Sequence, residues 1–323
     1  MSYLLHIGFN KTGSSAIQHY LSSSREFLLN SGICYPSIGL EGCAHHELSK
    51  LLLQKRRSSN LDSWIARLEE IEKSHEVVII SSEHLRTHSD IRKLADVFPQ
   101  GRTKIFLYVR EHYGFLSSWY QQSVQSGVTA VRFEDFIQIH SGAFCPIIKQ
   151  WEDVYGENNV RVAEYAPGEF LGESLVSDFS IRNNLPVNEH YDRSKRFNPS
   201  LSGNLLEFVR LLNYFCTREE TSEVADEIRR LLRQPDQSFR GALACEEAIV
   251  KKCRWMYRED RKDLRHKYGV SLTNMRHVPS PARTSSGDRL EDWLNIIEIA
   301  KKSCPKLINI IKKHPILQSL FSI

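Results

Sequence analysis

Residues suited to binding a phosphate group gather near the N-terminus, in the stretch HIGFNKTGSSAIQ at positions 6–18. The stretch supplies a cation, three hydroxyl groups and a glycine, at Lys11, Thr12, Gly13, Ser14 and Ser15. An apolar run precedes it and a helical pattern follows it, so the loop leads from a strand into a helix N-terminus. Backbone N–H groups at such a turn favour an anion. The structural alternative is a glycine turn whose helix is capped by a serine.

The order of these residues differs from that of the usual ATP-binding loop. That loop reads GxxxxGK[ST], with the lysine after the second glycine, whereas Lys11 precedes Gly13 here. An ATP site also needs an acidic ligand for magnesium, and the apolar run at 76–82 is followed by Glu83 and His84 rather than by an aspartate. A P-loop kinase of a small metabolite is therefore an alternative for which the sequence shows no acidic magnesium ligand.

A second stretch, YVREHYGFLSSWYQQ, carries an arginine at the end of another apolar run. An arginine at the carboxyl end of a parallel strand points into the crevice where ligands of open α/β sheets bind. Ser118 follows Arg110 by eight residues within a helical pattern, where it would meet the same anion. The structural alternative is a surface pair of Arg110 with a neighbouring glutamate, beside a solvated serine.

The elements that must position these residues follow from the apolar pattern. Near-continuous apolar runs at 3–9, 76–82, 104–110 and 159–165 predict strands buried on both faces of a parallel sheet. Helical patterns lie between them, at 14–30, 46–55, 60–74, 89–97, 111–126, 132–140 and 144–155. We therefore expect an α/β fold with a doubly wound parallel sheet flanked by helices. After about residue 168 the pattern becomes mostly helical, for example at 201–215 and 245–269.

Composition limits the class of protein. The chain has 323 residues, of which 41% are hydrophobic and 25% charged, and its net charge of +4 suits an anionic ligand without indicating nucleic acid. The seven cysteines are odd in number and show no CxxC spacing, which favours free thiols in a reducing compartment. The N-terminus lacks a secretory pattern, and no apolar run has the length of a membrane span. We expect a cytoplasmic protein.

Together, the two stretches resemble the sulfotransferases that use 3′-phosphoadenosine 5′-phosphosulfate (PAPS). In that family a loop of the type PKTGTT binds the 5′-phosphosulfate, and an arginine with a serine eight residues later binds the 3′-phosphate. The resemblance implies a P-loop-type fold and PAPS as co-substrate, with no required metal. It implies nucleotide contacts from Lys11, Thr12, Gly13, Ser14, Ser15, Arg110 and Ser118. Asn10 replaces the usual proline, which removes no ligand group.

Further segments resemble bacterial members of the family that act on glycans. These are GICYP, HHELSKLL and RFNPSLSGNLLEFVRLLN, and they imply a carbohydrate or glycolipid hydroxyl as acceptor. The resemblance covers residues 1–275, and residues 286–323 form a helical C-terminal extension. In KRFNPSLS, Arg196 matches the late basic loop that contacts the 3′-phosphate in the family. A loop that caps the following helix through Ser200 or Ser202 is the alternative.

Two neighbouring residues compete for the role of base. Sulfuryl transfer needs an in-line acceptor hydroxyl, a base for its proton, and positive charge on the leaving phosphate. Lys11 suits the last role. In glycan-type sulfotransferases a glutamate near the end of the second strand is the base, which points to Glu83, whereas in the small-molecule branch a histidine does this work, which points to His84. An ion pair of Glu83 with Arg86, and packing of His84, are the structural alternatives.

The stretch CAHHELSK adds His45 and His46 as candidate acceptor-binding residues. A metal site with Glu47 is an alternative, but adjacent histidines rarely converge on one ion. A helix start with solvated histidines is a further alternative. We therefore expect no metal in the site.

The C-terminal extension has an apolar stripe at helical spacing, at Leu290, Trp293, Leu294, Ile297 and Ala300, with lysines around it. Such a stripe packs on the main domain, on a second copy in a homodimer, or on an anionic membrane surface. A non-catalytic scaffold that binds nucleotide or glycan also fits an extension of this kind.

Overall fold

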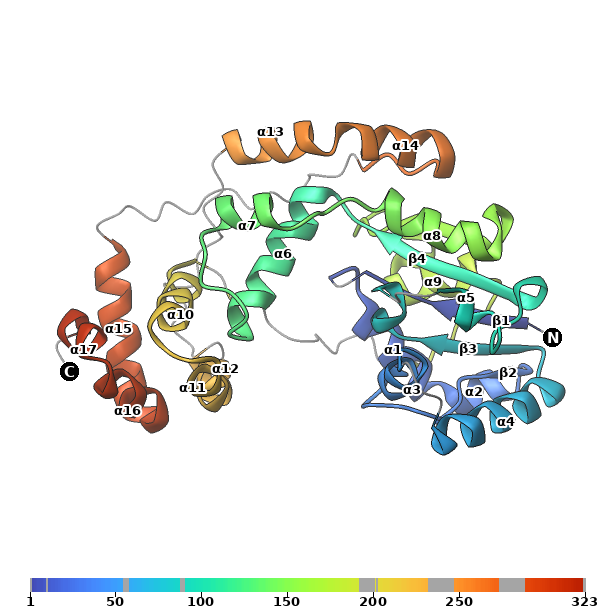
Figure 1. Ribbon diagram of the computed structural model, residues 1–323, viewed down its shortest axis with the longest axis horizontal. Coiled ribbons are helices and arrows are strands. Elements are labelled where there is room, and N and C mark those ends of the chain that lie inside the picture. The colour runs from blue at the N-terminus through green and yellow to red at the C-terminus, as the bar shows by residue number, and fades with distance from the viewer. Residues whose placement is uncertain are drawn as a thin grey trace. The chain divides into compact units, whose positions relative to one another are not determined.

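The computed structural model (Figure 1) describes residues 2–9, 11–54, 58–87, 91–191, 201, 203–231, 247–272 and 288–321. The chain divides into two units by its internal contacts. The first comprises Met1–Glu111, Ala143–Phe197 and Tyr257–Asn274, and the second comprises His112–Gly142, Asn198–Met256 and Met275–Ile323. This division cuts across the sequence-predicted boundary between 1–275 and 286–323, since helices from the middle of the chain group with the C-terminal ones.

A five-stranded sheet forms the centre of the first unit (Figure 1). Its strands are β1 (Ser2–His6), β2 (Ile33–Cys34), β3 (Val77–Ser81), β4 (Thr103–Val109) and β5 (Val160–Glu164), in the order β2-β3-β1-β4-β5. All neighbouring pairs are parallel. The predicted α/β fold with a parallel sheet is therefore confirmed. The chain order reverses at β1, which has β3 on one side and β4 on the other, and such a switch point opens a crevice at the carboxyl ends of the strands.

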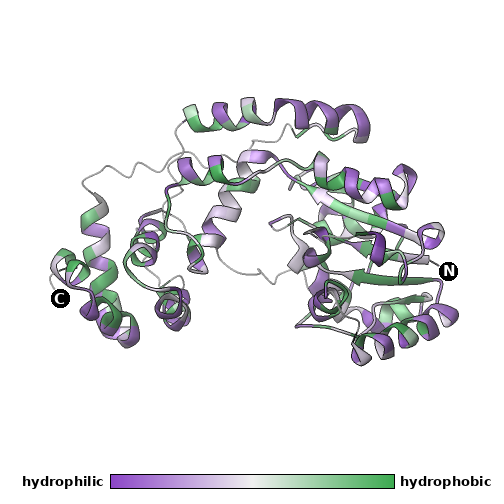
Figure 2. Ribbon diagram, viewed as in Figure 1, coloured by the Kyte–Doolittle hydropathy of each residue, from purple (hydrophilic) through white to green (hydrophobic). Residues whose placement is uncertain are grey.

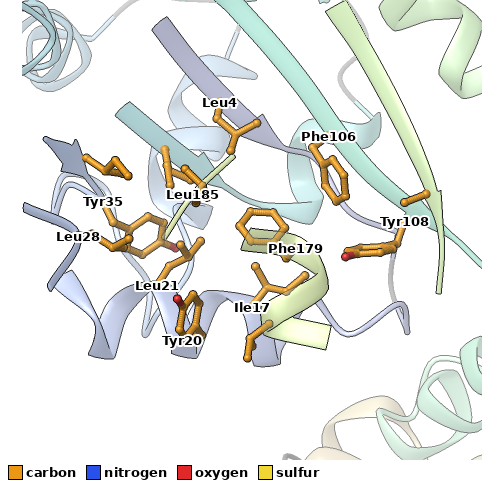
Figure 3. Packing of buried hydrophobic residues seen from close by; sticks show 14 residues of the cluster. Leu4, Ile17, Tyr20, Leu21, Leu28, Tyr35, Phe106, Tyr108, Phe179 and Leu185 are labelled. Carbon is orange, nitrogen blue, oxygen red and sulfur yellow. The ribbon is translucent and has the colours of Figure 1, made fainter. Parts of the chain in front are cut away.

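Helices cover both faces of this sheet. One face packs against α1 (Ser14–Ser23), α2 (Arg25–Leu29) and α9 (Leu175–Arg182), and Figure 3 shows Ile17 and Tyr20 of α1 gathered with Leu4 and Phe179. The other face packs against α4 (Ser59–Ser74) and α8 (Cys145–Tyr155). The remaining helices of the unit are α3 (His46–Leu52), α5 (Ile91–Leu94) and α14 (Arg258–Tyr268).

Two sequence-predicted helices are divided in the structure, and one strand was not predicted. The segment expected at 245–269 forms two helices, Glu247–Met256 and α14. The helix expected at 14–30 is two helices, since it breaks at Ser24, whose φ of −101° and ψ of 17° are not helical. The strand β2 was missed because it has only two residues, too few for a periodic pattern. Both residues of β2 are buried, and β2 pairs only with β3, so this strand forms the edge of the sheet.

The second unit is helical. It contains α6 (His112–Gln125), α7 (Phe133–Ile139), α10 (Gly203–Phe215), α11 (Arg218–Glu223), α12 (Ala225–Leu231), α13 (Glu247–Met256), α15 (Asp288–Ser303), α16 (Pro305–Lys313) and α17 (Pro315–Phe321). The C-terminal helices pack inside this unit, because α15 contacts α10 and α12. Trp293 donates from Nε1 to the carbonyl of Asn204, and Ile297 and Ala300 are buried. Packing on the rest of the chain thus accounts for the inner part of the apolar stripe.

The hydropathy of the residues differs between the buried strands and the outer helices. Figure 2 shows hydrophobic residues along β3 and a largely hydrophilic α14. None of the helices in the described part of the chain is both long enough and apolar enough to pass through a lipid bilayer.

Candidate functional site

The loop after β1 folds tightly around the carbonyl group of Phe9. Thr12 donates to that oxygen from its backbone N–H at 3.3 Å and from Oγ1 at 2.6 Å, and Ser14 Oγ donates to it at 3.4 Å. Thr12 and Ser14 are therefore buried and occupied by the loop itself, whereas Ser15 is exposed. In this conformation Thr12 and Ser14 hold the shape of the loop. Backbone N–H groups at the start of a helix lack partners within it and favour an anion.

Two residues of the loop adopt the left-handed conformation. Gly13 is the N-cap of α1, with φ of 83°, and it makes no side-chain capping bond, so the alternative of a serine cap is wrong. A Cβ at Gly13 would lie 2.1 Å from Leu175 Cδ2 and 2.9 Å from Tyr165 Cε2. Lys11 has φ of 67° although it carries a side chain. Such a conformation costs a non-glycine residue on the order of 1 kcal/mol or more, and strain of this kind gathers at functional sites.

Arg110, directly after β4, joins the loop to the neighbouring strand. Its Nη1 donates to the backbone oxygen of Lys11 at 3.2 Å, and its guanidinium lies over the ring of Tyr165, 5.6 Å from the centroid. Burial lowers the pKa of both Lys11 and Arg110, and their mutual repulsion lowers that of Lys11 further. An anion beside a partly buried lysine stabilises the charged form that burial and the neighbouring arginine disfavour. The structure thus brings Lys11 and Arg110 together as the sequence predicted.

Arg86 is a further cation at this loop, beside Lys11 and Arg110. Its guanidinium lies over the ring of Phe9, 4.9 Å from the centroid, and burial lowers its pKa. Its Nε is buried without a hydrogen-bond partner among the described residues. The stacking geometry depends on the tertiary fold, but the position of Arg86 three residues after Glu83 is visible in the sequence.

Glu83 lies at the carboxyl end of β3, at the start of the 3-10 helix Glu83–Thr87, and contacts α1. Its Oε2 accepts a hydrogen bond from Gln18 Nε2 at 2.8 Å. Gln18 follows Ser14 by one helical turn, which places it about 6 Å along the helix axis. Gln18 thus links the carboxylate of Glu83 to α1, the helix that directly follows the loop after β1. Gln18 was not among the predicted site residues, since a buried glutamine inside a helix carries no motif.

Two histidines accompany Glu83. His46 places Nε2 3.7 Å from Glu83 Oε2, and its Nδ1 forms a hydrogen bond of 2.8 Å with Ser82 Oγ. The ring of His84 stacks on that of His46 at 4.2 Å between centroids. Burial lowers the pKa of His46 although the charge of Glu83 raises it. Burial thus disfavours the imidazolium form of His46.

His45 has no surface for an acceptor, so its sequence-predicted role is corrected. The side chain is fully buried, its Nε2–H donates to the Pro36 carbonyl at 2.9 Å, and its Nδ1 accepts from the Ser81 N–H at 3.1 Å. Nδ1 thus ties the start of α3 to the end of β3, and Nε2 ties it to Pro36, which follows β2. Burial lowers the pKa of His45 to about 4.

His6, the last residue of β1, lies beneath the loop and was not singled out from the sequence. Its Nδ1 forms a hydrogen bond of 2.8 Å with Ser81 Oγ, and its buried Nε2 has no partner among the described residues. A Cβ on Gly8 would lie 3.0 Å from that Nε2 and 2.4 Å from Ser14 Oγ. Burial lowers the pKa of His6 to about 4, so the ring is neutral at neutral pH.

Two predicted nucleotide contacts stay predictions. Ser118 is half-buried on α6 in the second unit, whereas Arg110 belongs to the first. Arg196 lies outside the described residues.

The chain is similar in fold to solved structures, although the sequence comparisons find no match. No protein-family model matches the chain, and no curated protein matches it. The crystal structure of a sulfotransferase from Alicyclobacillus acidocaldarius is similar at 17% identity and a TM-score of 0.41, over 72% of this chain and 99% of that one. A likeness of this size says nothing about the substrate.

Proposed function

We propose that the chain is a sulfotransferase that moves a sulfuryl group from PAPS to a hydroxyl group of a carbohydrate or glycolipid. The observation that carries the proposal is the contact between Arg110 and the backbone of Lys11 at the switch point of the sheet. It supports a ligand with closely spaced anionic groups, held by two cations and by the start of α1. In this proposal Lys11 stabilises the charge that develops on the leaving phosphate.

The acceptor side of the proposal rests on Glu83. Gln18 and His46 both contact Oε2 of the carboxylate. Oε1 therefore has no hydrogen bond from the described residues. Gln18 orients the carboxylate through Oε2, and Oε1 is then available to take the proton of an acceptor hydroxyl. The hydroxyl oxygen bonds to sulfur as the bond from sulfur to the phosphate oxygen breaks, and adenosine 3′,5′-bisphosphate leaves. His84, which stacks on His46, is the competing base.

Ligand-induced thermal stabilisation tests the proposal. Adenosine 3′,5′-bisphosphate, AMP, and ATP with magnesium are compared at equal concentration in differential scanning fluorimetry. At about a hundred-fold excess over its dissociation constant a ligand adds about 2.7 kcal/mol to the free energy of unfolding. We expect the bisphosphate to stabilise most and AMP least. Stabilisation by ATP with magnesium alone would indicate a kinase, and stabilisation by none of them would refute nucleotide binding.

Retained bisphosphate binding without turnover would instead identify a nucleotide-binding scaffold. The cytoplasmic location, the homodimer and a contact of the C-terminal helices with a membrane remain predictions.

A further inference from the structure

Three side chains able to bind a metal ion meet in the second unit. Cys216 directly follows α10, Glu220 lies in α11, and His314 joins α16 to α17. Their sulfur, oxygen and nitrogen ligand atoms all lie within 4.8 Å of one another. Cys216 and Glu220, which are close in the sequence, thus meet His314 from near the other end of the unit's sequence. One thiol, one carboxylate and one imidazole come together, independently of the function proposed above.

The backbone holds two of these side chains in place. Thr217 and Glu220 form a capping box, in which the Thr217 N–H donates to Glu220 Oε2 at 2.8 Å and Thr217 Oγ1 accepts from the Glu220 N–H at 3.3 Å. The carboxylate is thereby fixed at the start of α11. His314 precedes Pro315, which favours an extended backbone, and it has φ of −107° and ψ of 105°. Little conformational freedom remains to be lost when an ion binds.

The spacing of the ligand atoms fits a tetrahedral zinc site closely. Zinc–ligand bonds of about 2.0–2.3 Å place the ligands of a tetrahedron about 3.3–3.8 Å apart. His314 Nε2 already lies 3.2 Å from Glu220 Oε2 and 3.4 Å from Oε1. Since no pair of ligand atoms exceeds 4.8 Å, a shift of about 1 Å in the Cys216 side chain completes the geometry.

The chemistry of the donors selects the ion. A thiolate and an imidazole favour zinc over magnesium or calcium, which prefer oxygen ligands. Binding removes the thiol proton of Cys216, so thiolate and carboxylate together offset the charge of the ion. Lys313, whose positive charge acts on Glu220, opposes the cation to some degree.

We propose that Cys216, Glu220 and His314 bind one zinc ion, with water as the fourth ligand. The ion ties the junction of α10 and α11 to the junction of α16 and α17. It therefore adds a link between the C-terminal helices and the helices that precede them in the second unit, beside the packing of Phe321 of α17 on Phe208 of α10.

Metal content and cobalt spectroscopy test this site on the full chain. Metal-free protein is given one equivalent of Zn²⁺ or Co²⁺ and passed through a desalting column, and the retained metal is measured. We expect one ion per chain, a near-ultraviolet thiolate-to-cobalt charge-transfer band, and a higher melting temperature with zinc. Cys216→Ser and His314→Gln should weaken binding by more than the roughly 10–100-fold that loss of an outer-sphere partner causes.

Matched controls are available in the first unit. Cys43→Ser removes a half-buried free thiol and His75→Gln a half-buried imidazole, and both should bind zinc like the wild type. Absence of retained zinc in the wild type would overturn the proposal, as would equal zinc binding by Cys216→Ser. Should that variant fail to fold, the wild-type cobalt spectrum decides, because a spectrum without the thiolate band excludes Cys216 as a ligand.

Discussion

Replacing Gly13 by alanine probes how the loop after β1 packs against Leu175 and Tyr165. The substitution adds one methyl group at the N-cap of α1, where φ is 83° and ψ is 11°. A residue with a side chain loses about 1–2 kcal/mol in this left-handed conformation. The methyl carbon would also lie 2.1 Å from Leu175 Cδ2 and 2.9 Å from Tyr165 Cε2. Overpacking of this kind costs about 1–3 kcal/mol, so the total loss of stability should be about 2–5 kcal/mol.

Gly269 provides a matched control within the same unit. It is the C-cap of α14, with φ of 67° and ψ of 16°, and a Cβ there would meet no atom within 4 Å. Gly269→Ala therefore has the backbone cost without the overpacking. Urea denaturation of both variants should show Gly13→Ala less stable than Gly269→Ala by about 1–3 kcal/mol.

Ligand binding separates the two variants further. Leu175 and Tyr165 must move to admit the methyl group, and the guanidinium of Arg110 stacks on the ring of Tyr165. Gly13→Ala should thus lose most of the thermal stabilisation by adenosine 3′,5′-bisphosphate, whereas Gly269→Ala should keep it. Equal stability of the two variants, with equal response to the bisphosphate, would refute the described packing of the loop.

Three more predictions concern single side chains. Arg110→Ala should weaken binding of adenosine 3′,5′-bisphosphate by about 1.5–3 kcal/mol and hardly affect adenosine 5′-phosphosulfate, which lacks the 3′-phosphate; equal losses in titration calorimetry would reject this role. Glu83→Gln should lower turnover by roughly 10²–10⁴ without weakening nucleotide binding, and His84→Ala should cost much less; the reverse order of rates would make His84 the base. His45 has a folded-state pKa of about 4, below the ordinary value of about 6.5, so the stability that its burial contributes is lost as pH falls from about 6.5 to about 4. His45→Gln should flatten the slope of unfolding free energy against pH in that window by up to about 1.4 kcal/mol per pH unit, and an unchanged slope would contradict this origin.

The fold was predictable from sequence wherever a pattern is long enough to show a period. The runs that became β1, β3, β4 and β5 are apolar throughout because both faces of the sheet are covered. β2 has only two residues, and its pairing with β3 is a tertiary event that no local pattern shows.

The site residues that directly follow a strand were predictable, because the ends of the strands were predictable. Lys11, Glu83 and Arg110 each follow a strand, and parallel strands end at one edge of the sheet. The direction in which a side chain points was not predictable from the sequence. His45 and His46 are neighbours in sequence, but His45 is buried between two backbone groups while His46 faces Glu83. Gln18 of α1 and His6 of β1 acquire their contacts only when these elements pack beside the end of β3.

Transfer of labelled sulfur tests the central claim most directly. The protein is incubated, without added magnesium, with PAPS that carries radioactive sulfur and with a panel of carbohydrates, and the label on each carbohydrate is measured after separation. The proposed function predicts label on at least one carbohydrate with the wild type. It predicts none with Lys11→Ala, because this variant lacks the cation that stabilises the leaving phosphate of PAPS. Wild-type protein that leaves all the label on PAPS, yet transfers the γ-phosphate of ATP to an acceptor when magnesium is added, would contradict it.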